Sequence, residues 1–158
     1  MMIRRSVVLL ALVGAVLVPP ALAQSDQGSP SLAGIGFGLK GGFGIAPDQG
    51  VFGAQYSLGK RVSVFRLVPN FDIGFGDAAT TADFNLDFLA RIQVEGSSLA
   101  FYAGGAPTLG LANETVNAGI TLVVGVQLPI LERNATNIEA RFGIGDIPDF
   151  RALFTIIF

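Results

Sequence analysis

Residues 80–94, Thr80-Thr81-Ala82-Asp83-Phe84-Asn85-Leu86-Asp87-Phe88-Leu89-Ala90-Arg91-Ile92-Gln93-Val94, alternate between apolar and polar side chains. The even-numbered positions from 82 to 94 are all apolar, and the odd-numbered positions from 83 to 93 are polar except for Leu89. A period of two is the signature of a β-strand whose two faces meet different surroundings. The stretch therefore predicts one strand, longer than the roughly five or six residues that are usual.

The same alternation recurs along the chain and predicts eight antiparallel strands. Short segments rich in Gly, Pro, Asn and Asp separate them, for example residues 47–50 (Pro-Asp-Gln-Gly) and 146–149 (Asp-Ile-Pro-Asp). Eight is the smallest strand number of outer-membrane barrels, whose strands need about 9–11 residues. The predicted strands cover residues 35–45, 52–58, 65–76, 80–94, 99–104, 116–128, 138–145 and 150–158.

The composition indicates which face of these strands is turned outward. Hydrophobic residues make up 51% of the chain and charged residues 14%, against about 25% charged in soluble domains. The polar faces are rich in glycine, which fits a narrow barrel interior, and the apolar faces carry nearly all of the 13 Phe residues. We therefore expect an all-β, up-and-down transmembrane barrel with its apolar face toward lipid. A soluble, periplasmic, lipocalin-like ligand binder, with the faces reversed, is the alternative.

The charged side chains on the polar faces nearly balance in sign. An Arg or Lys facing lipid at the bilayer midplane would cost about 2–4 kcal/mol, whereas inside the barrel opposite charges can pair. We expect a structural polar network in the lumen, formed by Lys40, Arg66, Asp72, Asp83, Asp87, Arg91, Glu139, Arg141 and Arg151. Such a network fills most of an eight-stranded barrel and predicts a closed lumen. A narrow channel for small or apolar molecules is the alternative.

The first 23 residues have the features of a secretory signal peptide. Arg4 and Arg5 precede an apolar core, and the small residues Ala21 and Ala23 mark a cleavage site. Removing this segment takes away two basic side chains and changes the net charge from −2 to −4, which leaves no basic surface for nucleic acid. The expected organisation is a signal peptide over residues 1–23, a short periplasmic leader over 24–34 and a barrel domain over 35–158.

The last predicted strand places Phe150, Ala152, Phe154, Ile156 and Phe158 on one face. This pattern resembles the C-terminal signal of bacterial outer-membrane barrels, in which a terminal aromatic residue is recognised during assembly. The resemblance implies that Phe154, Ile156 and Phe158 form the assembly signal.

Over residues 35–158 the chain is similar to the small outer-membrane β-barrel superfamily that includes relatives of OmpA, OmpX and OmpW. This resemblance implies an integral location in the outer membrane of a Gram-negative (diderm) bacterium and a structural role in the cell envelope. It also implies contact with outer-membrane lipids, and with the barrel assembly machinery and periplasmic chaperones during biogenesis. The OmpW branch is the source of the channel alternative. The sequence departs from the family in lacking Trp and having only two Tyr, Tyr56 and Tyr102, for the usual aromatic girdle.

Little in the sequence points to catalysis or to a cofactor. There is no His and no Cys, so the Ser–His and Cys–His pairs of common hydrolases are absent. Residues 36–41 match G-x-G-x-x-G, but within a strand pattern and not between a strand and a helix. Residues 83–87 resemble the start of a calcium loop, but Phe88 and Val94 occupy the positions that require Gly and Glu. We expect no enzyme activity, no cofactor and no metal, and the sequence names no ligand.

Overall fold

The computed structural model describes residues 36–58, 61–77, 80–112, 114–131 and 134–158. The expected signal peptide, its cleavage site and the leader lie outside these residues. Within them, no helix is long and apolar enough to cross a membrane. The strands are β1 (Gly36–Ile45), β2 (Gln49–Ser57), β3 (Arg61–Val62), β4 (Phe65–Phe75), β5 (Thr80–Gln93), β6 (Ala100–Ala112), β7 (Thr115–Leu131), β8 (Asn134–Gly145) and β9 (Phe150–Ile157).

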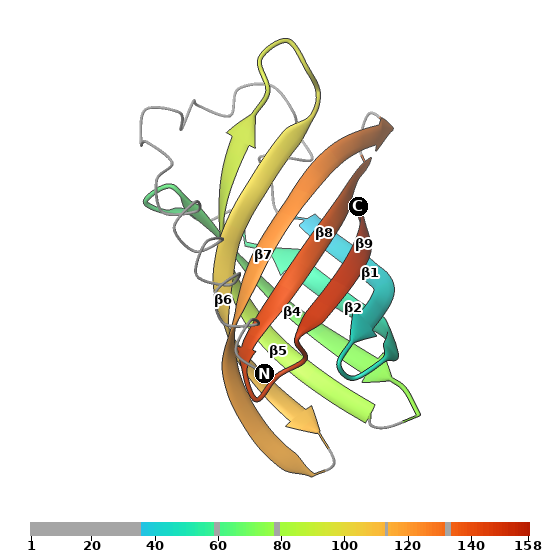
Figure 1. The fold of residues 1–158 in the computed structure, drawn as a ribbon. Helices are drawn as coiled ribbons and strands as arrows, with labels where there is room; N and C mark the ends of the chain where they lie inside the picture. Colours follow the sequence, from blue (N-terminus) through green and yellow to red (C-terminus); the bar gives the residue numbers. More distant parts are fainter. Residues whose placement is uncertain (1–35, 59–60, 78–79, 113, 132–133) are drawn as a thin grey trace, which may run out of the picture.

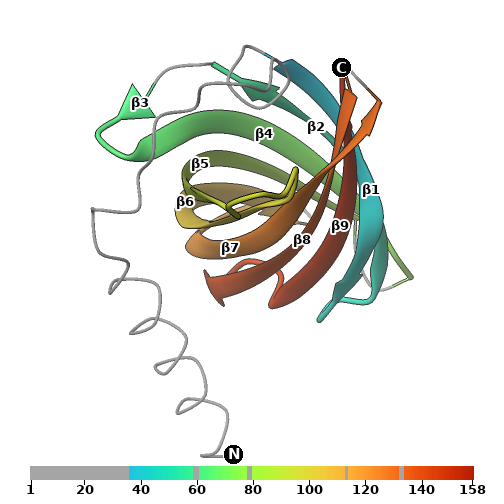
Figure 2. The same cartoon turned by 90° about the horizontal axis from the view of Figure 1, so that it is seen from above.

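Eight of these strands form one closed antiparallel barrel. From β4 to β9 each strand pairs with the next, β1 pairs with both β2 and β9, and a pairing between β2 and β4 completes the ring (Figures 1 and 2). The two-residue strand β3 pairs with β4 alone and was not predicted. Closure gives every long strand a paired neighbour on both sides and leaves no free edge around the ring. The predicted eight-stranded, antiparallel, up-and-down barrel is confirmed.

Several strand ends differ from the prediction. Gln49, predicted in a turn, begins β2 and pairs with Gly44, so the turn is confined to residues 46–48. Strand β8 begins at Asn134, whereas the predicted strand began at residue 138. The largest difference is β6, which continues to Ala112, whereas the predicted strand ended at residue 104. Two glycines and a proline follow residue 103 and interrupt the alternation there, but pairing with β5 and β7 keeps this segment extended.

Three prolines lie inside strands, each beside an interruption of a hydrogen-bond ladder. The β5–β6 register skips Pro107 and the residue before it, and the β2–β4 register ends next to Pro69. The β7–β8 register shifts between Pro129 and Leu131. Proline has no N–H to donate, so these interruptions are where a barrel can accept it.

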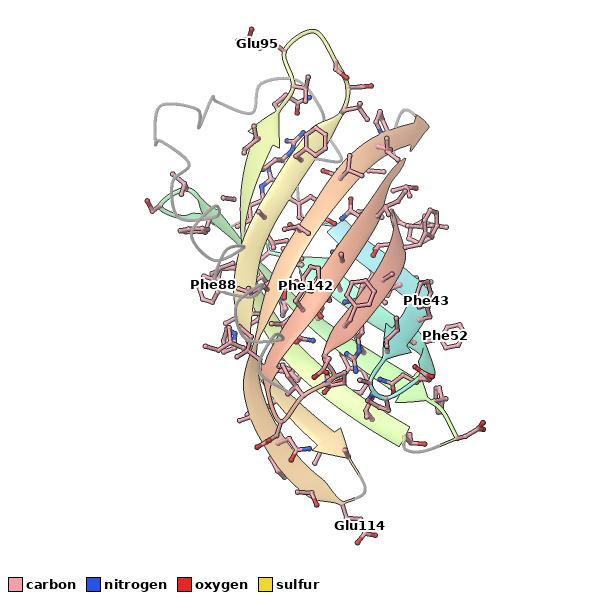
Figure 3. All side chains as sticks on the ribbon, in the orientation of Figure 1. Phe43, Phe52, Phe88, Glu95, Glu114 and Phe142 are labelled. Carbon is pink, nitrogen blue, oxygen red and sulfur yellow. The ribbon has the colours of Figure 1, made fainter. Side chains whose placement is uncertain are left out.

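The apolar face of the barrel is turned outward and the polar face inward. On β5, Phe84 is 52% exposed, whereas the adjacent Asp83 and Asn85 are 1% and 2% exposed. The labelled rings of Phe43, Phe52, Phe88 and Phe142 project from the outside of the wall (Figure 3). The buried polar residues are Lys40, Gln49, Gln55, Asn70, Asp72, Thr81, Asp83, Asn85, Asp87, Thr108, Thr121, Gln127, Thr136, Asn137, Glu139, Arg141, Arg151 and Thr155. This orientation is the one predicted for a membrane barrel and the reverse of a lipocalin-like barrel.

At one end of the barrel the turns carry acidic side chains only. The turns at residues 46–48 and 146–149, the end of β4 and the start of β7 lie at one end, where Glu114 marks the tip of the β6–β7 hairpin (Figure 3). The segments of sequence that connect the strands at this end are residues 46–48, 76–79, 113–114 and 146–149. These four turns carry five acidic side chains and neither Lys nor Arg. We call this the acidic end. The opposite end, which we call the terminal end because Phe158 lies there, includes the β5–β6 hairpin with Glu95 near its tip.

Candidate functional site

The polar lumen is the candidate site, and its first cluster joins β1 to β4 across β2. The Lys40 Nζ atom lies 2.7 Å from Asp72 Oδ1 and donates a hydrogen bond of 2.9 Å to Asn70 Oδ1. The residue between them on β2 is Gly53, which is paired with Lys40 on one side and with Asp72 on the other. A Cβ at Gly53 would clash with the Asp72 carboxylate and with the carbonyl oxygen of Phe71. The missing side chain therefore lets the two charges meet across an intervening strand.

The second cluster has the same arrangement on the other side of the barrel. The Tyr102 hydroxyl on β6 donates a hydrogen bond of 2.9 Å to Glu139 Oε2 on β8. Gly125 on β7 is paired with both residues, and a Cβ there would overlap the Tyr102 ring. A polar–glycine–polar row is thus present in each of the two clusters. In both rows the glycine gives a long side chain room to reach the second strand along the wall.

Arg141 on β8 is the central cation of the second cluster. Its Nη1 and Nη2 atoms donate to the two carboxylate oxygens of Asp87, at 3.3 and 2.6 Å. Its Nε atom donates to Glu139 Oε1 at 2.7 Å. The three side chains are almost completely buried. Two-point contact between guanidinium and carboxylate is a strong and directional pairing, and here it connects opposite parts of the wall.

The third cluster lies nearer the acidic end. Arg151 on β9 forms an ion pair with Asp83, and its Nη1 atom lies 3.8 Å from Asp72 Oδ2. The Arg151 guanidinium also donates to Thr81 Oγ1 at 3.2 Å, and that hydroxyl donates to Gln49 Oε1 at 3.0 Å. Asp72 thus faces both Lys40 and Arg151, so the first and third clusters form one network.

A neutral layer fills the space between the charged clusters. Asn85 donates to Asn70 Oδ1 at 3.0 Å and accepts a hydrogen bond of 2.7 Å from Thr108. The Thr108 and Thr121 hydroxyl oxygens lie 2.7 Å apart and share a further hydrogen bond. These contacts join β4, β5, β6 and β7 through the lumen. The polar atoms of this layer have protein partners, as buried polar groups generally do.

Seven of the nine predicted lumen residues are brought together in these contacts: Lys40, Asp72, Asp83, Asp87, Glu139, Arg141 and Arg151. Arg66 and Arg91 lie farther toward the terminal end, on neighbouring strands, since Arg66 is paired with Leu89. The Arg91 guanidinium contacts the Gln93 side chain. The three residues of the predicted assembly signal, Phe154, Ile156 and Phe158, are exposed on the outer face of the barrel. They lie on β9 or directly after it, beside β1. Ala21 and Ala23 lie outside the described residues.

The prediction did not include Tyr102 or the glycines that make room for the network. The sequence suggests only a place in the aromatic girdle for Tyr102, whereas the structure buries it in the lumen beside Glu139. The alternation did place Tyr102 on the inner face of its strand, and that signal could have identified it. Gly53 and Gly125 could not be singled out among 21 glycines, because their role depends on which residues lie opposite them.

The turn between β8 and β9 folds over the network at the acidic end. Ile147 is buried, and a Cβ at Gly119 would be 2.9 Å from its Cδ1 atom. Asp149 N donates to Ala46 O at 3.2 Å, which joins this turn to the β1–β2 turn. Beneath Ile147 lies a cavity of about 10 Å³, lined in part by Asp83, Arg141 and Arg151. This volume is about that of a single water site.

The lumen chemistry is that of ion pairing and hydrogen bonding. Within the described ranges, no group of three or more metal-ligating side chains is arranged to hold a metal ion. Lys40, Arg141 and Arg151 face the four carboxylates of Asp72, Asp83, Asp87 and Glu139. The arrangement can crosslink the wall from inside.

Comparison with solved structures finds similarity to the crystal structure of the N-terminal β-barrel domain of Pseudomonas aeruginosa OprF. The TM-score is 0.64 at 11% sequence identity, and the match covers 78% of this chain and 95% of that domain's chain. At this identity the likeness establishes the barrel fold alone. No protein-family model and no curated protein sequence matches the chain.

Proposed function

We propose that this chain is an integral outer-membrane β-barrel protein with a structural role in the cell envelope and a lumen closed by its polar network. The observation that carries the proposal is the reversed distribution of side chains. Large apolar residues, including Phe43, Phe52 and Phe154, are exposed on the outside, while charged residues are buried within. In water such a surface would be a large aggregation-prone patch, whereas in a bilayer it is the surface that lipid requires.

The closed lumen is supported by the position of the ion pairs. Asp83 and Asp87 on β5 contact Arg151 on β9 and Arg141 on β8, which lie across the barrel from them. Side chains that cross the lumen in this way obstruct a pore. An eight-stranded barrel has just enough interior volume for side chains to fill. The expected function is therefore mechanical and architectural, with neither catalysis nor rapid transport.

Biogenesis supplies the expected partners. We propose that Phe154, Ile156 and Phe158 are read by the barrel assembly machinery, that periplasmic chaperones deliver the chain, and that residues 1–23 direct its export. With an even number of strands, both ends of the barrel domain would lie on the periplasmic side. The acidic end would then face the cell exterior.

The test uses the barrel in detergent and in vesicles. The protein should migrate differently on SDS gels before and after boiling, and it should remain in the membrane pellet after an alkaline wash. Planar bilayers containing the heat-modifiable form should show no conductance above a lipid-only control. Recovery of a folded, soluble protein without detergent would contradict the membrane proposal.

One observation favours a narrow conduit as the second candidate. The small cavity beneath Ile147 shares Asp83, Ile147 and Pro148 with a larger cavity at the acidic end. A shift of the β8–β9 turn would join the two cavities. Regular conductance steps in planar bilayers would favour the conduit over the closed barrel, and substitution of Ile147 by Ala should then enlarge them.

A further inference from the structure

A cavity of about 260 Å³ opens at the acidic end of the barrel, between the β1–β2 turn, the β8–β9 turn and the ends of β6 and β7. We call it the mouth cavity. Much of its wall is apolar and includes Pro47, Leu111 and Ile147. Its polar groups include Asp83, Asn117 and Asp146. Asp83 is already engaged by Arg151, whereas Asp146 lies exposed at the rim.

The turns that surround the mouth cavity carry charges of one sign only, and the buried Arg151 beneath them is paired with Asp83. The four turns at this end carry Asp48, Asp77, Glu114, Asp146 and Asp149, and none of them carries Lys or Arg. A concave site ringed by charges of one sign concentrates ligands of the opposite sign. The mouth therefore attracts cations and repels anions.

The lining distinguishes between kinds of cation. A bare metal ion needs several oxygen ligands in a fixed arrangement, and no such group of side chains occurs among the described residues. Apolar walls offer nothing to a hydrated inorganic ion but can cover an alkyl chain. The volume also lies below the range of about 300–1,000 Å³ that is typical for drug-sized ligands.

We propose that the mouth cavity binds a small aliphatic ammonium ion. The ammonium group lies beside Asp146 and within hydrogen-bonding reach of polar groups of the lining such as Asn117. The alkyl chain lies against Pro47 and Ile147. This inference goes beyond the proposed function: it needs the folded barrel but depends neither on a closed lumen nor on the membrane in which the barrel resides.

The test compares three probes of similar size and different charge: n-butylammonium, n-butanol and n-butyrate. The full barrel is labelled at isoleucine methyl groups in zwitterionic micelles, and the Ile147 signal is followed by NMR during titration. Butylammonium should shift this signal saturably, with a dissociation constant of about 1–10 mM, a modest affinity for a ligand of five heavy atoms. Butyrate should cause no saturable shift, and butanol should bind at least about tenfold more weakly.

Two charge-neutralising substitutions in the same turn separate contact from long-range attraction. Asp146→Asn removes a carboxylate of the cavity lining and should raise the dissociation constant about threefold or more. Asp149→Asn removes an equal charge from an exposed residue that is not among the cavity lining and should raise it less than about twofold. Heat-modifiable migration on SDS gels confirms that each variant is folded.

Three results would overturn the inference. Butanol or butyrate binding as tightly as butylammonium would show that charge does not select the ligand. If Asp146→Asn and Asp149→Asn raised the dissociation constant of butylammonium equally, the ligand would be attracted by the overall negative charge of this end and not held at a defined site. A folded barrel whose Ile147 signal does not saturate with butylammonium would show that the cavity does not bind it. Conductance measurements test the closed lumen separately, so the two proposals fail independently.

Discussion

The inner and outer faces of one barrel wall are built from the same strands but follow opposite chemistry. On β5, Asp83 and Asp87 point inward and are buried, while Phe84 and Phe88 alternate with them and point outward. On the outer face, neighbouring side chains need only be apolar, because lipid adapts to their shape. On the inner face, each charge requires a partner at a defined position. The outer face therefore accepts many apolar side chains, whereas the inner face requires particular residues at particular positions.

Glycine shows this contrast most clearly. Gly53 faces inward, and a Cβ there would clash with Asp72, whereas Gly41 faces outward on the adjacent strand and a Cβ would meet its nearest neighbour at 4.0 Å. Both residues are strand glycines, so sequence alone gives them the same description. Because of their positions relative to the lumen, substitution of Gly53 is expected to be costly and substitution of Gly41 is not.

Among the described residues, few buried apolar side chains contact one another inside the barrel. The one cluster of buried apolar residues found there consists of Ala135 and Ile157. Ion pairs and hydrogen bonds occupy the position that a hydrophobic core holds in a soluble domain. The comparison of faces predicts that the largest stability effects come from unpaired charges in the lumen.

The largest effect is expected for Arg141→Met. This substitution leaves the buried carboxylates of Asp87 and Glu139 without their main partner, and it should lower the free energy of unfolding by about 3–5 kcal/mol. The folded fraction is measured by the SDS gel shift of unboiled samples over a urea series in micelles. Arg141→Met combined with Asp87→Asn and Glu139→Gln should recover most of the loss. A triple variant as unstable as the single one would mean that packing, and not charge, explains the effect.

The next effect tests the outer face at two depths. Phe71→Arg, in the middle of β4, should cost about 2–4 kcal/mol in lipid vesicles, because it places a charge in the hydrocarbon region. Val116→Arg, beside the β6–β7 turn, should cost no more than about 1 kcal/mol. Urea titrations in vesicles measure both. If the two arginine substitutions lowered the free energy of unfolding equally, the outer face would not lie in the bilayer.

Tyrosine offers a matched pair across the wall. Tyr102→Phe removes the hydroxyl that donates to Glu139 in the lumen and should cost about 1.5–3 kcal/mol. Tyr56→Phe removes a hydroxyl from the outer face and should change stability by less than about 0.5 kcal/mol. The same urea series in micelles compares them. A cost at Tyr56 as large as that at Tyr102 would break the distinction between the faces.

The smallest effect concerns the glycine gap itself. Gly53→Ala should cost about 1–3 kcal/mol, because the added methyl group forces Asp72 away from Lys40. Gly41→Ala should stay within about 0.5 kcal/mol of the parent protein, since its Cβ would meet its nearest neighbour at an ordinary contact distance of 4.0 Å. Refolding yield and urea midpoints measure both variants. If Gly53→Ala were as stable as the parent protein, the Lys40–Asp72 ion pair would not depend on the space left by the missing side chain.

Much of the fold could be predicted from the sequence, because alternation is a local property. Residues 80–94 indicate a two-faced strand without reference to any partner, and β5 ends within one residue of the predicted boundary. The prediction was weakest in β6, where residues that break the alternation are held extended by pairing with β5 and β7. Strand β3 escaped prediction because two paired residues leave no periodic signal.

The sequence by itself determined that the chain forms an inside-out barrel of eight strands, and it identified the charged residues that face the lumen. The tertiary structure decided which of them meet. Lys40 reaches Asp72 across Gly53, and Tyr102 reaches Glu139 across Gly125. The physical reason is that the alternation of side chains along a strand depends only on consecutive residues. Pairing in the lumen depends instead on the register between strands. That register is fixed only when all eight strands close into one barrel.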